Sequence, residues 1–163
     1  MSILDSLIRL KGGNRKTAGA GKSEITEESM QLNPYLNFNG QCEAALKFYE
    51  QVLGGKITFK QTWGDSPMAE HVPEETYNNI LHSTLEVAGS TLMCADSPPD
   101  QYKQPQGIQI TLNFKEAAEG EAMFKALSEG GRIDMPFQAT FWSSGFGMCV
   151  DKFGIPWMVN CEQ

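Results

Sequence analysis

The order of hydrophobic and polar positions is the same in two successive stretches of the chain. Residues 31–38 alternate between apolar and polar side chains, which predicts a strand, and apolar residues then recur at helical spacing until Gly54 and Gly55. A further strand and a hairpin that turns at Ala88 and Gly89 follow. The second stretch repeats this order, so the expected helices are 45–53 and 116–129, and the expected strands are 31–38, 56–63, 80–87, 90–96, 107–114, 131–137, 145–151 and 155–161.

An internal repeat relates the two stretches. At a separation of 76 positions, the triplet Leu-Asn-Phe at 36–38 recurs at 112–114, and the Gly-Gly-basic-Ile block at 54–57 recurs at 130–133. These matches lie in the same order and register, which chance rarely produces. The sequence therefore predicts a duplicated structural unit.

The two hairpins match at a separation of 65 positions instead, which pairs Gly89 with Gly154 and Glu86 with Asp151. The first stretch accordingly holds about 11 extra residues, and these fall in the loop 64–79. A polar loop of this length in a compact domain is usually functional, so loop 64–79 is a candidate lid over a cavity.

The first 30 residues differ from the rest of the chain. Ile3, Leu4, Leu7 and Ile8 share one helical face, and the Gly-, Lys- and Ala-rich segment 12–22 indicates a flexible linker. The short helix could dock on a partner or on a second protomer. Alternatively, the stretch precedes a start at Met30 and has no role of its own.

The charge balance excludes some classes of partner. The net charge of −7 repels phosphate backbones and anionic membranes, and no apolar run approaches the roughly 18 residues that a membrane span requires. No signal-peptide pattern occurs at the N-terminus. The four cysteines form no C-x-x-C pair, so reduced and mostly buried thiols are expected. We therefore expect a cytoplasmic protein that binds neither nucleic acid nor a membrane.

Five segments are typical of a known family: PYLNFNG at 34–40, LKFYEQVLGG at 46–55, WGDSPM at 63–68, LHSTLEVAGSTLMCADSPP at 81–99 and TFWSSGFGMCVDKFGIPWMVN at 140–160. With these segments the chain resembles the PhnB-like branch, also labelled 3-demethylubiquinone methyltransferase-like, of the vicinal oxygen chelate (glyoxalase/bleomycin resistance) superfamily. The methyltransferase label gains no support from the sequence, because no Gly-rich loop follows a first strand in a Rossmann-like order.

This resemblance implies an α+β fold in which two tandem βαβββ modules form a curved, mixed, eight-stranded sheet. The concave face of the sheet would enclose a ligand in the trough between the modules, and the helices would cover the convex face. The expected organisation is an N-terminal helix and linker over 1–30 and a vicinal oxygen chelate domain over 31–163, with module 1 over 31–98 and module 2 over 105–162.

Strand alternation then sorts the side chains between the two faces. Leu81, Leu85 and Val87 should pack beneath a helix, which leaves His82 and Thr84 toward the cavity. By the same alternation, the repeat-related amides of Asn37 and Asn113 should also point into the cavity.

Catalytic members of the superfamily hold a divalent ion with side chains from the first and last strands of each module. The resemblance puts these positions at Pro34, Met93, Gln109 and Met158. Only Gln109 could ligate, since proline has no side-chain donor and a thioether binds hard ions poorly. We therefore predict that the standard metal site is absent, although a divalent metal at another site stays open.

His82 is the candidate catalytic residue. On a cavity-facing strand it could act as a base, donate a hydrogen bond to a ligand, or bind a metal together with Asp96. It could equally be a structural histidine whose ring nitrogens form hydrogen bonds with neighbouring residues in the cavity wall. The acidic loop around His71 has no coordination spacing and is expected to be solvated.

Aromatic residues near the mouth of the trough could stack on a flat ligand. Trp63 and Trp142 are the candidates, whereas Phe141 and Trp157 are expected in the core. The complete set of predicted ligand-binding residues is Asn37, Trp63, His82, Thr84, Asp96, Gln109, Asn113 and Trp142.

Three functions stay open at this point. The first is a small-molecule-binding protein that holds its ligand without the standard metal site. The second is a divalent-metal-dependent lyase, isomerase or dioxygenase-like enzyme with a relocated site around His82. The third is an interaction module that docks through its N-terminal helix. A homodimer is expected by analogy, because members of the superfamily commonly pair.

Overall fold

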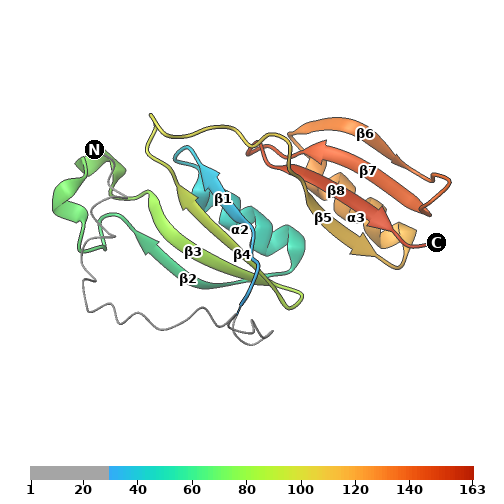
Figure 1. Ribbon diagram of the computed structural model, residues 1–163, viewed down its shortest axis with the longest axis horizontal. Coiled ribbons are helices and arrows are strands. Elements are labelled where there is room, and N and C mark those ends of the chain that lie inside the picture. Colours follow the sequence, from blue (N-terminus) through green and yellow to red (C-terminus); the bar gives the residue numbers. More distant parts are fainter. Residues whose placement is uncertain (1–29) are drawn as a thin grey trace, which may run out of the picture. The chain divides into compact units, whose positions relative to one another are not determined.

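Each half of the described chain folds as one strand, one helix and three further strands (Figure 1). The computed structural model describes residues 30–163. The helix and linker expected over 1–30 therefore lie outside the described residues, except for Met30. The first half consists of β1 (Tyr35–Phe38), α2 (Cys42–Leu53), β2 (Lys56–Thr62), β3 (Ile80–Val87) and β4 (Ser90–Asp96), with the short 3-10 helices η1 (Ala69–His71) and η2 (Glu74–Thr76) between β2 and β3.

The second half repeats this order and confirms the α+β class with two tandem βαβββ modules. Two strands begin later than the sequence pattern predicts: β1 begins after Pro34, which has no N–H for a ladder hydrogen bond, and the fifth strand begins after Gln109. The elements are β5 (Ile110–Phe114), α3 (Ala117–Ser128), β6 (Arg132–Gln138), β7 (Gly145–Val150) and β8 (Pro156–Cys161).

The eight strands form two four-stranded sheets with the same internal arrangement. The orders are β1-β4-β3-β2 and β5-β8-β7-β6, with the first strand of each sheet parallel to its neighbour and the other pairs antiparallel. Within residues 30–163 no backbone pairing joins the two sheets. The mixed sheet expected from the resemblance is thus divided into two equal sheets, one for each module.

Strand register corrects one match between the repeats. Lys56 pairs with Glu86, and its repeat equivalent Arg132 pairs with Val150, so Glu86 corresponds to Val150 rather than to Asp151. The third strands therefore align at a separation of 64 positions, whereas the fourth strands keep the separation of 65. The reason is that the β7–β8 turn is one residue longer than the β3–β4 turn.

The duplicated Gly-Gly pair ends each helix and lets the next strand approach the sheet. Gly54 and Gly130 have φ angles of 67° and 72°, a left-handed conformation in which other residues are strained. A Cβ atom on Gly55 would lie 2.8 Å from the carbonyl oxygen of Glu86, and one on Gly131 would collide with that of Val150. The first glycine thus supplies a backbone conformation and the second supplies space.

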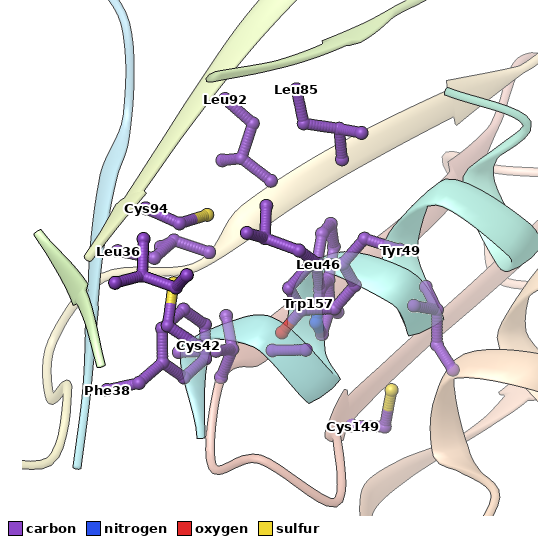
Figure 2. Packing of buried hydrophobic residues seen from close by; sticks show 14 of the residues in the cluster. Leu36, Phe38, Cys42, Leu46, Tyr49, Leu85, Leu92, Cys94, Cys149 and Trp157 are labelled. Carbon is purple, nitrogen blue, oxygen red and sulfur yellow. The ribbon is translucent and has the colours of Figure 1, made fainter. Parts of the chain in front are cut away.

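Both modules contribute to one buried hydrophobic cluster (Figure 2). Leu36 and Phe38 of β1 pack with Leu46 and Tyr49 of α2, and Trp157 of β8 joins them from the second module. Trp157 is only 1% exposed, which confirms its expected place in the core. Burial of large side chains on one side of each sheet is the main favourable contribution to the stability of such a fold.

Asp151 connects the two modules through a fully buried hydrogen-bond network. Its Oδ2 atom accepts hydrogen bonds from the Tyr49 hydroxyl of α2 at 2.6 Å and from the Trp157 indole nitrogen at 2.8 Å. Its Oδ1 atom accepts bonds from the backbone N–H groups of Phe153 and Ile155 at 2.8 and 3.0 Å. The carboxylate therefore has four donors, as a buried charge requires.

The turn that carries Asp151 also packs on α2 through its side chains. Phe153 contacts the rings of Phe48 and Tyr49, with ring centroids 5.6 and 6.2 Å away. The Lys152 ammonium lies 4.3 Å from the centroid of the Phe48 ring, a favourable cation–π distance. The longer β7–β8 turn thus forms one of the contacts between the modules.

The loop between β2 and β3 is closed at its base and internally bonded. The N–H groups of Trp63 and Gly64 donate to the carbonyl oxygens of Asn79 and Tyr77, at 3.0 and 2.9 Å. Ser66 is buried and donates to the Trp63 carbonyl at 2.7 Å. The proposed role of this loop as a lid stays a prediction.

All four cysteines are buried and free, which confirms the expectation from their spacing. Burial raises the pKa of the Cys149 thiol to about 11. The thiolate is the reactive form of cysteine, so the burial and the raised pKa both disfavour a reaction at Cys149. No helix within residues 30–163 is long and apolar enough to cross a membrane.

Candidate ligand-binding site

The side of the first sheet that faces away from α2 carries a set of partly exposed aromatic and polar side chains. On β3, Ser83 and Leu85 are buried toward the helix, so the alternating His82 and Thr84 lie on the opposite side. We call this side the first open face. Its members are Tyr35, Asn37, Phe59, Gln61, His82, Thr84 and Met93, which register pairs place on one side of the sheet.

His82 lies between two aromatic rings on the first open face. Its Nδ1 atom is 3.1 Å from the Tyr35 hydroxyl, and the two rings stack with centroids 5.7 Å apart and planes at 22°. Phe59 lies on the other side, with its centroid 5.8 Å from that of His82. Tyr35 and Phe59 are 45% and 47% exposed, which is high for such large apolar rings.

Tyr35 is a candidate site residue that the sequence reasoning missed. Partial burial of the phenol raises the pKa of Tyr35 above its ordinary value of 10.0. The hydroxyl forms a hydrogen bond with Nδ1 of His82. The alternation of β1 held a signal for this residue, since Tyr35 is two positions before Asn37 and therefore lies on the same side. Its contact with His82 joins positions that are 47 residues apart, which alternation cannot reveal.

Asp96 lies on the other side of the first sheet from His82. Its Oδ1 atom accepts a hydrogen bond from the N–H of Cys42, the first residue of α2, at 3.0 Å. Its Oδ2 atom accepts one from the N–H of Ile80 at 2.8 Å. The carboxylate thus accepts a hydrogen bond from a free N–H group at the start of α2 and connects β3 to that helix. It does not contact His82.

The second sheet has an equivalent side that is more apolar. Trp157 and Val159 of β8 are buried, whereas Met158 and Asn160 alternate with them on the side away from α3. We call this side the second open face. Its members are Thr111, Asn113, Met135, Phe146, Met148, Met158 and Asn160.

Asn37 and Asn113 occupy repeat-related and exposed positions on the two open faces. Asn113 accepts a hydrogen bond from the Nδ2 atom of Asn160 at 3.2 Å. Asn37 pairs in register with Ala95, which offers no polar side chain. The two amides therefore occupy equivalent positions in the two modules but have different neighbours.

Gln109 lines a hollow of about 500 Å³ at one end of the second open face. Arg132, Val150 and Pro156 also line it, so all three other strands of the sheet contribute. Arg132 and Asp134 form an ion pair at 2.6 Å at this hollow. Gln109 is thereby separated from the aromatic residues at the opposite end of the same face.

Trp142 lies at that opposite end and extends the second open face. Its ring contacts Phe146 edge to face, with centroids 5.6 Å apart, and it is 48% exposed. Phe141 was expected in the core, but it is 90% exposed, so this expectation is wrong. The loop turns back through the bond from the Thr140 N–H to the Ser143 carbonyl, and the buried Ser143 side chain leaves its neighbours outside.

Trp63 lies just after β2, at the end of the first sheet where β3 begins. It is half-buried, and its N–H closes the base of loop 64–79. The structure thus groups His82, Thr84 and Asn37 on one face with Trp63 at its end. Asn113, Gln109 and Trp142 belong to the second module, in which Asn113 lies in β5 and the other two lie outside the strands.

Three of the four positions to which the resemblance assigns metal ligands, Pro34, Met93 and Met158, hold residues that bind hard cations poorly. In register, Met93 pairs with Tyr35, and Met158 pairs with Thr111. The Thr111 hydroxyl donates to the Met158 sulfur at 3.7 Å. Across residues 30–163 no group of three or more His, Cys, Asp or Glu side chains is arranged to hold a metal ion.

Comparison with known proteins gives the family of the chain. Residues 30–160 match the family described as 3-demethylubiquinone-9 3-methyltransferase. The chain is 36% identical to protein YjdN of Escherichia coli K12 over 139 residues, which cover 80% of this chain and 95% of YjdN.

Solved structures agree with this assignment. The crystal structure of protein PA1353 from Pseudomonas aeruginosa shares 44% identity and a TM-score of 0.76, over 83% of this chain and 99% of that one. The PhnB protein from Bacillus cereus has a TM-score of 0.69 at 22% identity, over 81% and 99% of the two chains. The fosfomycin resistance protein FosX of Listeria monocytogenes, at 7% identity and a TM-score of 0.59 over 83% and 94%, shares the fold. The chain therefore belongs to the family described as 3-demethylubiquinone-9 3-methyltransferase, and it shares its fold with the PhnB protein and FosX.

Proposed function

We propose that the protein binds a small, flat and mainly apolar molecule between the first open face and the second open face. The observation that carries this proposal is the exposure of Tyr35 and Phe59, two large rings that flank His82 on a sheet face. Apolar side chains grouped on an accessible surface commonly mark a binding site. The site uses no metal at the standard positions of the superfamily, and we place the protein in the cytoplasm.

The second open face supports the same function with different chemistry. Met135, Met148 and Met158 are neighbours across three strands, because the register pairs Met148 with both of the others. Methionine side chains are flexible and polarisable, so they adapt to the outline of an apolar ligand. Phe146 and Trp142 continue this surface toward its end.

The proposed ligand contacts follow the two open faces. Asp96 is omitted, because both of its oxygens already accept backbone hydrogen bonds on the helix side of the sheet. The remaining predicted contacts are Asn37, Trp63, His82, Thr84, Gln109, Asn113 and Trp142, to which the geometry of the first open face adds Tyr35 and Phe59.

A homodimer is part of the proposal, because members of the superfamily commonly pair. The 90% exposed ring of Phe141 offers an apolar surface for such a contact. Sedimentation equilibrium of the purified protein should give twice the monomer mass of 18.0 kDa. A monomer at micromolar concentration would exclude the homodimer but would not contradict ligand binding.

The binding function is tested by fluorescence titration of the purified protein with naphthalene derivatives. We expect saturable binding that Phe59→Ala weakens at least about fivefold, because the substitution removes a ring that the ligand contacts. The matched control is Ile133→Ala. Ile133 is 52% exposed, but it pairs with the buried Cys149 and so belongs to the other side of its sheet. Equal weakening by both substitutions, or no saturable binding, would contradict the proposal.

The metal-dependent alternative has its own measurement. Protein purified without a histidine tag is analysed for bound divalent metal, before and after dialysis against the suspected ion. Stoichiometric metal that is lost in His82→Ala would replace the proposed function with a relocated metal site. The proposal expects no such difference between the wild-type protein and the variant.

A further inference from the structure

Register gives each position on the first open face an equivalent on the second. Tyr35 pairs with Met93 as Thr111 pairs with Met158, so Tyr35 corresponds to Thr111. Gln61 pairs with His82 as Gln138 pairs with Phe146, so His82 corresponds to Phe146. The ring of His82 therefore has an apolar ring as its counterpart.

The polar pair on the first open face thus has no counterpart in the second module. Phe59 pairs with Thr84 as Met135 pairs with Met148, so the flanking ring is replaced by a thioether. A duplicated unit starts with equal halves, and here only one half carries a histidine hydrogen-bonded to a phenol. A ligand held between these faces would meet a hydrogen-bonded histidine–tyrosine pair on one side only.

The Tyr35–His82 pair can offer one donor and one acceptor to a ligand. If the Tyr35 hydroxyl donates to Nδ1 of His82, the other ring nitrogen carries a proton and the phenol oxygen keeps lone pairs. If Nδ1 donates instead, the phenol proton and the unprotonated Nε2 are left. Within residues 30–163 neither side chain makes another side-chain hydrogen bond. In both arrangements one donor and one acceptor therefore face the ligand.

We infer that the ligand is a hydroxylated aromatic compound whose hydroxyl group binds the Tyr35–His82 pair. This inference rests on the proposed function and names its ligand class. A hydroxyl group both donates and accepts, so it uses both groups of the pair, whereas an ether or an alkyl group does not. The aromatic ring of the ligand lies against Phe59. The rest of the ligand is apolar and contacts Met148 and Phe146 on the second open face.

The size of the effect follows from ordinary hydrogen-bond strengths. Two neutral hydrogen bonds in a partly buried site favour a hydroxyl over a methyl group of similar size by about tenfold in affinity. Removal of either member of the pair lowers this preference to about threefold or less, because it removes one of the two hydrogen bonds. The affinity for the apolar analogue should change little, because the ring contacts stay.

The test compares 2-naphthol with 2-methylnaphthalene by fluorescence titration of the full chain. Wild-type protein should bind 2-naphthol about tenfold more tightly, whereas His82→Phe and Tyr35→Phe should bind both compounds with affinities equal within about threefold. The control His71→Phe makes the same substitution at the other histidine, which is exposed in η1, and should keep the preference. Melting temperatures show whether each variant is folded.

Each outcome has a separate meaning. Equal binding of both compounds by the wild-type protein, or a preference that survives in His82→Phe, would overturn the inference and leave the proposed function intact. Failure of both compounds to bind would reject the proposed function together with the inference. Loss of preference in both pair variants, with retained binding of 2-methylnaphthalene, would establish it.

Discussion

The hydroxyl of Tyr49 lies 2.6 Å from the Oδ2 atom of Asp151, and this hydrogen bond joins the helix of one module to a turn of the other. Tyr49 is fully buried, and Asp151 is 3% exposed. Each group satisfies the other in a region without solvent, where an unpaired carboxylate or phenol would be strongly unfavourable. The two residues therefore add a buried polar contact to the apolar packing between the modules.

Removal of this contact should lower stability. We expect Tyr49→Phe to reduce the free energy of unfolding by about 1.5–3 kcal/mol, and Asp151→Ala by more than about 3 kcal/mol, because its four donors then lose their acceptor. Urea denaturation measures both. The control Asp134→Ala breaks the exposed ion pair with Arg132 and should change stability by less than about 1 kcal/mol. A loss in Asp151→Ala as small as that in Asp134→Ala would contradict the role of the junction.

Tyr49 should also make the protein sensitive to alkaline pH. Burial, together with the negative charge of Asp151, raises the pKa of Tyr49 above the ordinary value of 10.0. The folded state therefore holds this proton more tightly than the unfolded state does. The stabilising contribution is complete below pH 10 and is lost as the pH rises further, at about 1.4 kcal/mol per pH unit. Unfolding measured between pH 9 and 11 should show a shallower loss in Tyr49→Phe than in the wild-type protein. Parallel curves would exclude this titration.

The two glycines that end α2 should respond differently to the same substitution. Gly54→Asn should lower the free energy of unfolding by no more than about 1 kcal/mol, because asparagine tolerates the left-handed conformation and the site is open. Gly55→Asn should lower it by at least about 2 kcal/mol more, since its Cβ would press on the backbone of Glu86. Thermal melts of the two variants provide the comparison, and similar melting temperatures would argue against the close approach.

Substitutions of Asp96 and His82 should distinguish a role in stability from a role in ligand binding. We expect Asp96→Ala to lower stability by about 1–3 kcal/mol, because the N–H groups of Cys42 and Ile80 lose their acceptor. His82→Ala should change stability by less than about 1 kcal/mol while it weakens ligand binding. Denaturation and ligand-binding measurements on both variants test these two expectations. Weaker binding in a folded Asp96→Ala protein would return Asp96 to the ligand site.

The amino-acid sequence by itself determined the duplicated unit, its order of elements and the side of the sheet on which Asn37, His82 and Thr84 lie. Each of these is local information: the spacing of apolar residues reports the period of a helix or a strand, and Leu36 and Phe38 are buried because they alternate with Tyr35 and Asn37. The repeated Gly-Gly pair marked the ends of both helices for the same reason.

Only the tertiary structure decided which distant residues meet. Alternation placed His82 on the open face but could not bring Tyr35 to it, and it did not reveal that Asp96 binds the start of α2. The one extra residue in the β7–β8 turn, which makes Val150 rather than Asp151 the equivalent of Glu86, is visible only in the pairing of the strands. Local periodicity depends on neighbours along the chain, whereas these contacts depend on strand register and turn length, which set where side chains far apart in sequence come together.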